Sequence, residues 1–499
     1  MENKKHPGPI AFGILALGCF FIGVQYFYNR SLWFDEALLA LNIINRDFAG
    51  LLSPLDYYQS APVLFLLIER FFVQISGQGE MSLRAFPVLC SLFSVLLFYR
   101  IAPKLYPNKT TGLLASSLFC LSPSLIYFSS EVKQYACDVL VLLLNYWVMF
   151  RHVEEKKTFR HPTLSIVGIA SVFLSNIAPV VLCTTGILLV AKGVRQRSFK
   201  NPENIKTYLV VASWMAAFAA YYFLFIAGHP LQQHMTDYWQ KAFPPQNPFS
   251  IEFLKWCARA AKMVFTRILA FPEKYGLFAL FVLGYVAALA HLFNSRKFEL
   301  LFLLTAPVGL HFALAYFQFY PFDHRFMLYQ TPLFAIGVSI GFYYFYREII
   351  EKRLKKRWPV LLFLPSAIFL FQLIAEFPIE RDEIKRSINF INKNIESGDN
   401  LYVYYGAAGA FRYYRQIGFA SVGNPAVFGQ SEPRERTIFI EDLAQFKGRI
   451  WVLFSHLQPF GTEAEKTFIV NHLSEKGKLL GTFNTKGSAA YLFDLGADE

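Results

Sequence analysis

The chain has 499 residues, of which 17 % are charged and 18 % are aromatic, and its mean hydropathy is positive. A soluble globular protein of this length carries about 25 % charged residues, so this composition excludes that class. The net charge of +13 does not indicate nucleic-acid binding, because the basic residues stand mostly in short segments between apolar runs.

Apolar runs long enough to cross a bilayer recur along the first three quarters of the chain. We predict about eleven transmembrane helices. The segment 61–75 is short, follows a proline and contains Glu69 and Arg70, so we interpret it as a juxtamembrane or re-entrant helix. The predicted spans are 8–27, 85–101, 111–128, 136–150, 163–176, 178–193, 207–227, 275–293, 299–317, 327–346 and 359–375.

The distribution of Lys and Arg predicts which side each loop faces. The basic residues are densest in the N-terminus and in segments 100–109, 151–160, 192–206, 294–298 and 347–358, which we place in the cytoplasm. The N-terminus is then cytoplasmic, and the first apolar run is an uncleaved span. The segments 28–84, 129–135, 228–274, 318–326 and everything after 376 face the outside of a plasma (inner) membrane.

The character of the sequence changes at Phe377, where charge density rises and short strands alternate with helical patterns. We predict strands at 401–405 and 449–455, helices near 408–417 and 462–476, and strands in the last stretches KLLGTFN and AAYLFDL. This divides the chain into a transmembrane domain, 1–376, and a small extracytoplasmic α/β domain, 377–499. The glycines of YYGAAGAF fit a phosphate cradle, but a plain turn between strand and helix is the preferred interpretation.

Four polar clusters stand in the outward-facing segments. Each has a structural alternative: Asp35 caps a helix that begins at Glu36, Glu80 and Arg84 form a surface ion pair, and Lys133 and Arg325 extend to lipid headgroups. Four clusters of acids and bases on one membrane face favour a shared site instead. The candidate residues are Asp35, Glu36, Arg84, Glu131, Lys133, Tyr135, Asp138, His324 and Arg325.

These residue types suit transfer of a sugar from a polyprenyl phosphate, whose head group lies at this depth while its tail stays in lipid. The phosphate is already a good leaving group, so one carboxylate is enough as the base, unlike glycoside hydrolysis with its two carboxylates. Lys and Arg stabilise the departing phosphate. Asp35, at a helix N-terminus, is the candidate base, because that position favours an ionised carboxylate.

Cysteine and histidine give no metal or disulfide signal. The six cysteines show no CxxC spacing, and most lie in or beside apolar runs as small core residues. His229 and His234 share the long fourth outer loop without carboxylates or cysteines at ligand spacing, so we predict no metal centre. A requirement for a divalent metal is left open.

Several stretches resemble the GT-C superfamily of membrane glycosyltransferases, specifically its family 39 or PMT-like group, which includes protein O-mannosyltransferases and lipid A aminoarabinose transferases. Lys133, Tyr135 and Asp138 match the family's K-x-Y-x-x-D stretch, and Arg325 matches its R-Y/F-x-L-P-like segment. Relatives often carry His or Lys just before the proline where this chain has Ser60 and Ala61. The stretches are SLWFDEALLALNI, QSAPVLFLLIERFF, GEMSLRAFPVLCSLFSVLLFY, SSEVKQYACDVLVLLL and HRFMLYQTPLFAI.

The resemblance implies an inverting glycosyltransferase of the bacterial cell envelope with a polyprenyl-monophosphate sugar donor and a catalytic Asp in the first outer loop. Asp35 occupies that position, with Glu36 beside it. The acceptor is a glycan, a lipid or a protein. Two alternatives stay open: a transporter or flippase of lipid-linked sugars, and a ligase of lipid-linked glycans that uses a diphosphate-linked donor.

Overall fold

The computed structural model describes residues 8–154, 160–195, 201–228, 232–269, 276, 278–352, 359–421, 426–430, 436–458 and 461–496. The chain forms two compact units. The first comprises 1–26, 60–68 and 85–377 and is helical, and the second comprises 27–59, 69–84 and 378–499 and contains a five-stranded sheet. The second unit therefore joins the C-terminal residues to two segments from the start of the chain.

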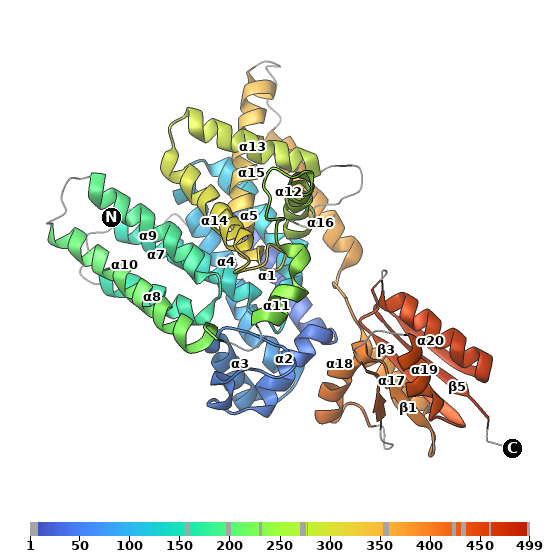
Figure 1. The fold of residues 1–499 in the computed structure, drawn as a ribbon. Coiled ribbons are helices and arrows are strands. Elements are labelled where there is room, and N and C mark those ends of the chain that lie inside the picture. Colours follow the sequence, from blue (N-terminus) through green and yellow to red (C-terminus); the bar gives the residue numbers. More distant parts are fainter. Residues whose placement is uncertain are drawn as a thin grey trace. The chain divides into compact units, whose positions relative to one another are not determined.

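Helices α1, α3 and α4 run through the unit boundaries, and the others lie within one unit (Figure 1). The α-helices up to the C-terminal region are α1 Pro9–Tyr28, α2 Phe34–Asn45, α3 Val63–Ser76, α4 Glu80–Leu105, α5 Lys109–Cys120, α6 Pro123–Phe128, α7 Tyr135–Glu154, α8 Arg160–Leu174, α9 Ala178–Arg195, α10 Pro202–Tyr221, α11 Gln232–Tyr238, α12 Ile251–Met263, α13 Phe278–Asn294, α14 Phe298–Tyr316, α15 Thr331–Phe345 and α16 Leu364–Glu376. Short 3-10 or π-helical turns cover Gly50–Leu52, Tyr222–Ile226, Gln240–Ala242, Val264–Ile268, Leu328–Gln330, Tyr346–Glu351 and Pro359–Phe363.

Among the described residues, seven helical segments are long and apolar enough to cross a membrane, and three shorter apolar helices accompany them. These ten match ten of the predicted spans. The eleventh, 111–128, is instead broken into α5 and α6, because Ser122 caps a new helix through the N–H of Leu125 and Pro123 occupies its first turn. Segment 61–75, which we predict to be juxtamembrane or re-entrant, forms α3, and this helix is not among the ten.

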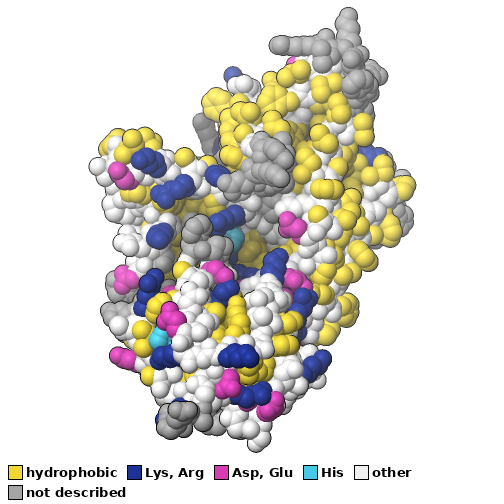
Figure 2. Space-filling view, turned by 90° about the vertical axis from the view of Figure 1, so that its right-hand side faces the viewer, with side chains coloured by type: hydrophobic (Ala, Val, Ile, Leu, Met, Phe, Trp, Pro, Cys, Tyr) yellow, Lys and Arg dark blue, Asp and Glu magenta, His cyan; other side chains and the backbone are white. Residues whose placement is uncertain are grey.

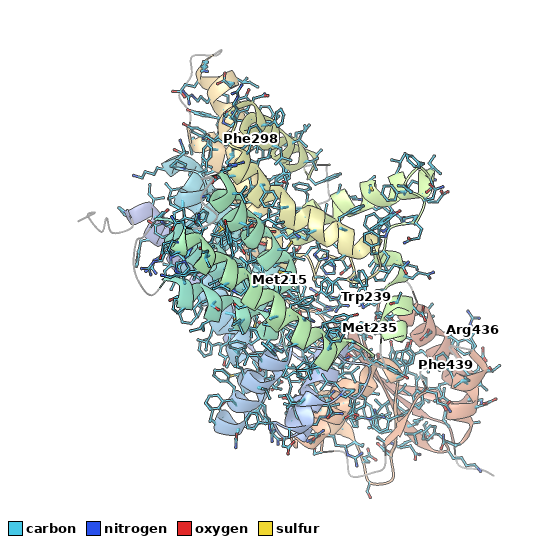
Figure 3. The ribbon with its side chains drawn as sticks, turned by 60° about the vertical axis from the view of Figure 1, so that its left-hand side comes forward. Met215, Met235, Trp239, Phe298, Arg436 and Phe439 are labelled. Atoms are coloured by element: carbon cyan, nitrogen blue, oxygen red, sulfur yellow. The ribbon has the colours of Figure 1, made fainter. Side chains whose placement is uncertain are left out.

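Apolar surface dominates the helical unit, as expected for contact with lipid (Figure 2). Met215 of α10, labelled in Figure 3, is 69 % exposed, and Phe371 of α16 is 74 % exposed. The interior of this unit contains α15, where every residue from Thr331 to Gly341 is buried. A helix that is apolar on all sides belongs in such a position.

The C-terminal part is an α/β domain with the strand order β2-β1-β3-β5-β4. Strands β1, β2 and β3 are parallel, and β5 and β4 continue the sheet antiparallel. The small α/β domain is therefore confirmed, although the prediction omitted α17, β2 and α19. Its elements are α17 Ile384–Asn394, β1 Asn400–Val403, α18 Tyr405–Gln416, β2 Ala426–Phe428, α19 Arg436–Ala444, β3 Arg449–Ser455, α20 Thr462–Lys476, β4 Lys478–Thr485 and β5 Ser488–Asp494.

Two glycines allow α13 and α15 to pack closely. A Cβ atom added to Gly341 would lie 1.7 Å from the carbonyl oxygen of Gly284, so the two backbones touch where neither residue has a side chain. We predict that Gly341→Ala destabilises the protein by about 1–3 kcal/mol, because the helices must separate to admit the methyl group. The measurement is the Tm of the purified protein in detergent.

Gly309→Ala is the matched control, because Gly309 lies on the exposed side of α14 with nothing within 4 Å of an added Cβ. Its Tm should equal or slightly exceed that of the wild type, since alanine favours a helix more than glycine does. Equal Tm values for Gly341→Ala and wild type would contradict the close packing of α13 and α15.

Candidate functional site

The first candidate residues lie in the first turn of α2. This helix begins at Phe34, after Trp33 in an extended conformation, so Asp35 and Glu36 both stand inside the first turn. The interpretation of Asp35 as the cap of a helix beginning at Glu36 is therefore wrong. Glu36 instead accepts a hydrogen bond from the N–H of Trp33 (3.4 Å), while Asp35 is half-buried.

Glu36 lies between two buried arginines. Its Oε2 is 2.9 Å from Nη1 of Arg30, and its Oε1 is 3.1 Å from Nη2 of Arg84. None of the three side chains is more than 1 % exposed. Arg84 also donates to the carbonyl oxygens of Arg30 (2.7 Å) and Ser31 (3.3 Å), so it fixes the backbone between α1 and α2.

This geometry favours a positioning role for Glu36 and Arg84. Both oxygens of Glu36 contact guanidinium groups, and the guanidinium of Arg84 is directed at Glu36 and at the two carbonyls. Contact of Glu36 with a reacting atom and contact of Arg84 with a phosphate stay predictions. Of the two adjacent acids, Asp35 is the more exposed.

Residues from the C-terminal region complete the surroundings of this loop. Ser31 Oγ donates to Glu383 (3.1 Å) and accepts from the backbone N–H of Lys385 (3.1 Å). Lys385 pairs with Glu80 (2.8 Å) and Arg84 pairs with Glu36, which differs from the structural alternative of a surface pair between Glu80 and Arg84. Tyr414 accepts from the N–H of Leu32 (2.8 Å) and donates to Glu80 (3.1 Å).

Helix α2 itself packs on α18 of the α/β domain. A Cβ on Gly409 would lie 2.7 Å from Cδ2 of Leu38, so this glycine serves close packing between the helices. Gly406 likewise lies against the carbonyl oxygen of Ser455. Close packing therefore explains both glycines, which supports a plain turn between strand and helix over a phosphate cradle. At the other end of α2, Arg70 donates to the carbonyls of Ile43 and Ile44, which accounts for a charge inside α3.

A second group of candidates lies in the helical unit, at the start of α7. Tyr135 is the first residue of this helix and Asp138 follows one turn later, where its Oδ1 accepts from Ser175 (2.6 Å). Glu131 and Lys133, in the preceding turn, are 0 % and 5 % exposed. Burial of Lys133 at this depth fits a binding role better than extension to lipid headgroups.

Arg325 stands in the segment before α15 and stacks on aromatic rings. Its guanidinium carbon lies 4.8 Å from the ring centre of Trp239 and 5.8 Å from that of Phe326. Trp239, labelled in Figure 3, directly follows α11. Stacking of this kind holds the guanidinium in one plane. The sequence analysis did not single out Trp239, because an aromatic residue in a long loop carries no motif.

Asp323 and His324 form a close pair beside Arg325. Their Oδ1 and Nδ1 atoms are 2.8 Å apart. Burial raises the pKa of Asp323, but the hydrogen bond and charge of His324 and the charge of Arg325 outweigh it, so the pKa lies below its usual value. The carboxylate is therefore held ionised next to Arg325 and in contact with His324.

Aromatic contacts connect the two parts of this second group. The rings of Tyr135 and Phe326 are 6.1 Å apart, and those of Phe128 and His324 are 6.2 Å apart. Contacts between these four rings thus join the start of α7 and the end of α6 to the segment before α15. Asp35, Glu36 and Arg84 lie in the second unit, and a joint site of the two groups stays a prediction.

Residues 60–223 match the model of a family described as dolichyl-phosphate-mannose-protein mannosyltransferase. The fold is similar to the crystal structure of ArnT from Cupriavidus metallidurans bound to undecaprenyl phosphate, with a TM-score of 0.50, 11 % identity and 98 % of each chain covered. About a third of the chain is thus similar to this family, and the whole chain has a fold similar to that of ArnT.

The apo-state crystal structure of ArnT from Cupriavidus metallidurans gives a TM-score of 0.37 and 13 % identity, and covers 98 % of this chain and 100 % of that chain. A search of the curated proteins found no match. The predicted fold class and the resemblance to this family are confirmed, the resemblance over residues 60–223. The matched residues include Arg84, Lys133 and Asp138 but neither Asp35 nor Arg325, and the role of each residue stays a prediction.

The buried cluster around Glu36 yields a stability prediction. Glu36→Gln keeps the shape of the side chain but leaves Arg30 and Arg84 without their shared counter-charge, so we expect a loss of about 3–5 kcal/mol. The readouts are the Tm and the yield of folded protein in detergent.

Asp56→Asn is the matched control. It removes the ion pair with Arg46, in which the Asp56 side chain is 64 % exposed, and should cost at most about 1 kcal/mol. Similar stability of Glu36→Gln and Asp56→Asn would contradict a tightly buried cluster.

The pair of Asp323 and His324 yields a pH prediction. Since the pKa of Asp323 is lowered in the folded protein, its ionised form stabilises the fold above the ordinary Asp pKa of about 3.9. That contribution disappears as the pH falls through the lowered value. We therefore expect Asp323→Asn to have a lower Tm than the wild type near neutral pH and a shrinking difference below about pH 4. A difference that stays constant with pH would refute this assignment.

Proposed function

We propose that this protein is an inverting glycosyltransferase that moves a sugar from a polyprenyl-monophosphate carrier to an acceptor on the outer face of the membrane. The observation that carries the proposal is the pair of acids in the first turn of α2. Glu36 is committed to Arg30 and Arg84, whereas the half-buried Asp35 stands beside it at a helix N-terminus. The reaction requires a carboxylate that is not fully buried as its base, because the acceptor has to reach it.

In the proposed reaction, Asp35 accepts the proton of the acceptor's hydroxyl or amine as that group attacks the anomeric carbon. The bond between the anomeric carbon and the phosphate oxygen breaks, and its electron pair leaves with the polyprenyl phosphate. Attack from the side opposite the phosphate inverts the anomeric configuration. The positive end of the α2 dipole favours the ionised form of Asp35 before the proton arrives.

The departing phosphate needs cations, and the helical unit supplies two candidates. Lys133 is buried before α7, and Arg325 is stacked on Trp239 and Phe326. Tyr135 contacts Phe326 and His324 contacts Phe128, and we assign Tyr135 and His324, with Glu131, to binding the donor. The hydrogen bond to Ser175 suits Asp138 to orienting the start of α7. The similarity to ArnT, whose structure contains undecaprenyl phosphate, supports a polyprenyl-phosphate donor.

We place the protein in the plasma (inner) membrane with the N-terminus in the cytoplasm and residues 377–499 outside. This orientation rests on the Lys and Arg distribution. The acceptor is a glycan, lipid or protein, and the α/β domain is a candidate to bind it.

The test uses the purified full chain in detergent, radiolabelled polyprenyl-monophosphate sugars and a membrane extract as the source of acceptor. Wild type should transfer the label and release polyprenyl phosphate, and Asp35→Asn should reduce transfer at least about 100-fold, as expected for loss of a general base. Asp47→Asn is the matched control, because Asp47 lies exposed just beyond the other end of α2 and its amide replacement can still accept from the N–H of Gly50.

Equal transfer by wild type and Asp35→Asn would remove Asp35 from the mechanism. Movement of the labelled lipid across reconstituted vesicles without release of polyprenyl phosphate would favour the transporter. Activity with a diphosphate-linked donor alone would favour the ligase.

A further inference from the structure

The parallel strands of the α/β domain have a topological switch point. Strands β1 and β3 are neighbours, and the helices that follow them lie on opposite faces of the sheet. Helix α18, after β1, packs with α17, whereas α20, after β3, packs with α19 (Figure 1). In open α/β sheets, ligands bind at the carboxyl ends of the two strands that flank such a point.

In this protein, residues at the start of α2 lie beside the carboxyl ends of β1 and β3. His456 directly follows β3, and its ring stacks on Phe34 at 5.3 Å and on Trp33 at 5.8 Å between ring centres. Strand β1, next to β3, is followed by α18, and Gly409 of α18 lies against Leu38 of α2. The first turns of α2 thus lie at the place where other open α/β sheets bind their ligands.

His456 is also held by the segment that precedes α17. Its Nδ1 lies 3.2 Å from Oδ2 of Asp382, and Asp382 is only 3 % exposed. Next to it, Arg381 places its guanidinium 3.5 Å from the ring centre of Trp33. The residue that caps α2 is therefore enclosed by His456 and by the 381–382 segment.

The backbone of His456 supports a special role. Its φ angle is +59°, in the left-handed region, which is uncommon for residues other than glycine, although asparagine, aspartate and histidine adopt it more often than the rest. Such conformations persist where the surrounding structure requires them, and they concentrate at functional sites. Here the conformation directs the imidazole to Trp33 and Phe34 immediately before Asp35.

We infer that His456 is a positioning residue for Asp35. The α/β domain uses the carboxyl ends of β1 and β3 to hold the first turn of α2, and His456, fixed by Asp382, sets the direction of the Asp35 carboxylate through the rings of Trp33 and Phe34. This inference rests on the proposed function, in which Asp35 is the base. It gives the C-terminal domain a part in the reaction that does not require contact with substrate.

The test compares His456→Ala and His456→Asn in the full-length purified protein. Alanine removes the ring and the bond to Asp382. Asparagine removes the ring but tolerates the left-handed conformation and can still donate to Asp382, so it remains folded even if alanine does not. The matched control is His472→Ala, since His472 is a histidine of α20 in the same domain that stacks on Phe468.

Two readouts are measured for each variant. The first is kcat and KM for the polyprenyl-monophosphate sugar, and the second is hydrogen exchange in peptides covering 33–40, with peptides of β3 and β5 as internal references. We expect His456→Ala to lower kcat at least tenfold with KM within twofold, and to speed exchange in 33–40 but not in the sheet. His456→Asn should lie between alanine and wild type, and His472→Ala should equal wild type.

The two proposals fail in different ways. Unchanged kcat and unchanged exchange in both His456 variants would overturn the positioning role. Equal loosening of 33–40 and of the sheet in His456→Asn would also overturn it, because it would show a general structural role. Full transfer by Asp35→Asn, with 33–40 loosened selectively in His456→Ala, would remove Asp35 as the base and leave His456 as the residue that holds α2.

Discussion

The carboxylate of Glu36 balances two arginines that are withdrawn from water, and the geometry of the first outer loop depends on that balance. Arg30 lies in the link between α1 and α2, and Arg84 lies in the first turns of α4, so one carboxylate joins this link and α4 to α2. Burying such charges is costly in itself. The cluster is therefore best understood as fixing one arrangement of the loop, with Asp35 placed beside it.

Much of the fold could be predicted because its signals are local. Apolar runs identify spans from composition alone, and the strand at 449–455 and the helix at 462–476 have the predicted bounds. The break in 111–128 also has a local cause, since Ser122 and Pro123 carry the capping and proline signals that end one helix and begin another. Strand β2 was missed because three residues are too few to show an alternation.

The candidate site was predictable in its residue types but not in their partners. Two adjacent acids mark α2, yet nothing local distinguishes the one held by arginines from the one beside it. The partners of Glu36 stand 6 and 48 residues away, and those of Ser31 and Leu32 stand more than 350 residues away. Contacts over such separations depend on how the chain folds back, which periodicity does not encode. Trp239 was missed for the same reason, because its importance comes from Arg325.

The compact second unit has a consequence for anyone who exchanges parts between relatives. A chimera joined at the end of α16 would bring a foreign α18 and a foreign 380–385 segment to a native α2, and the bonds from Ser31 to Glu383 and from Leu32 to Tyr414 would lose one partner each. The unit that can be exchanged is discontinuous, so a chimera has to take residues 27–59, 69–84 and 378–499 from the same parent. Over evolution, substitutions in these three segments should be correlated, although most of the chain separates them.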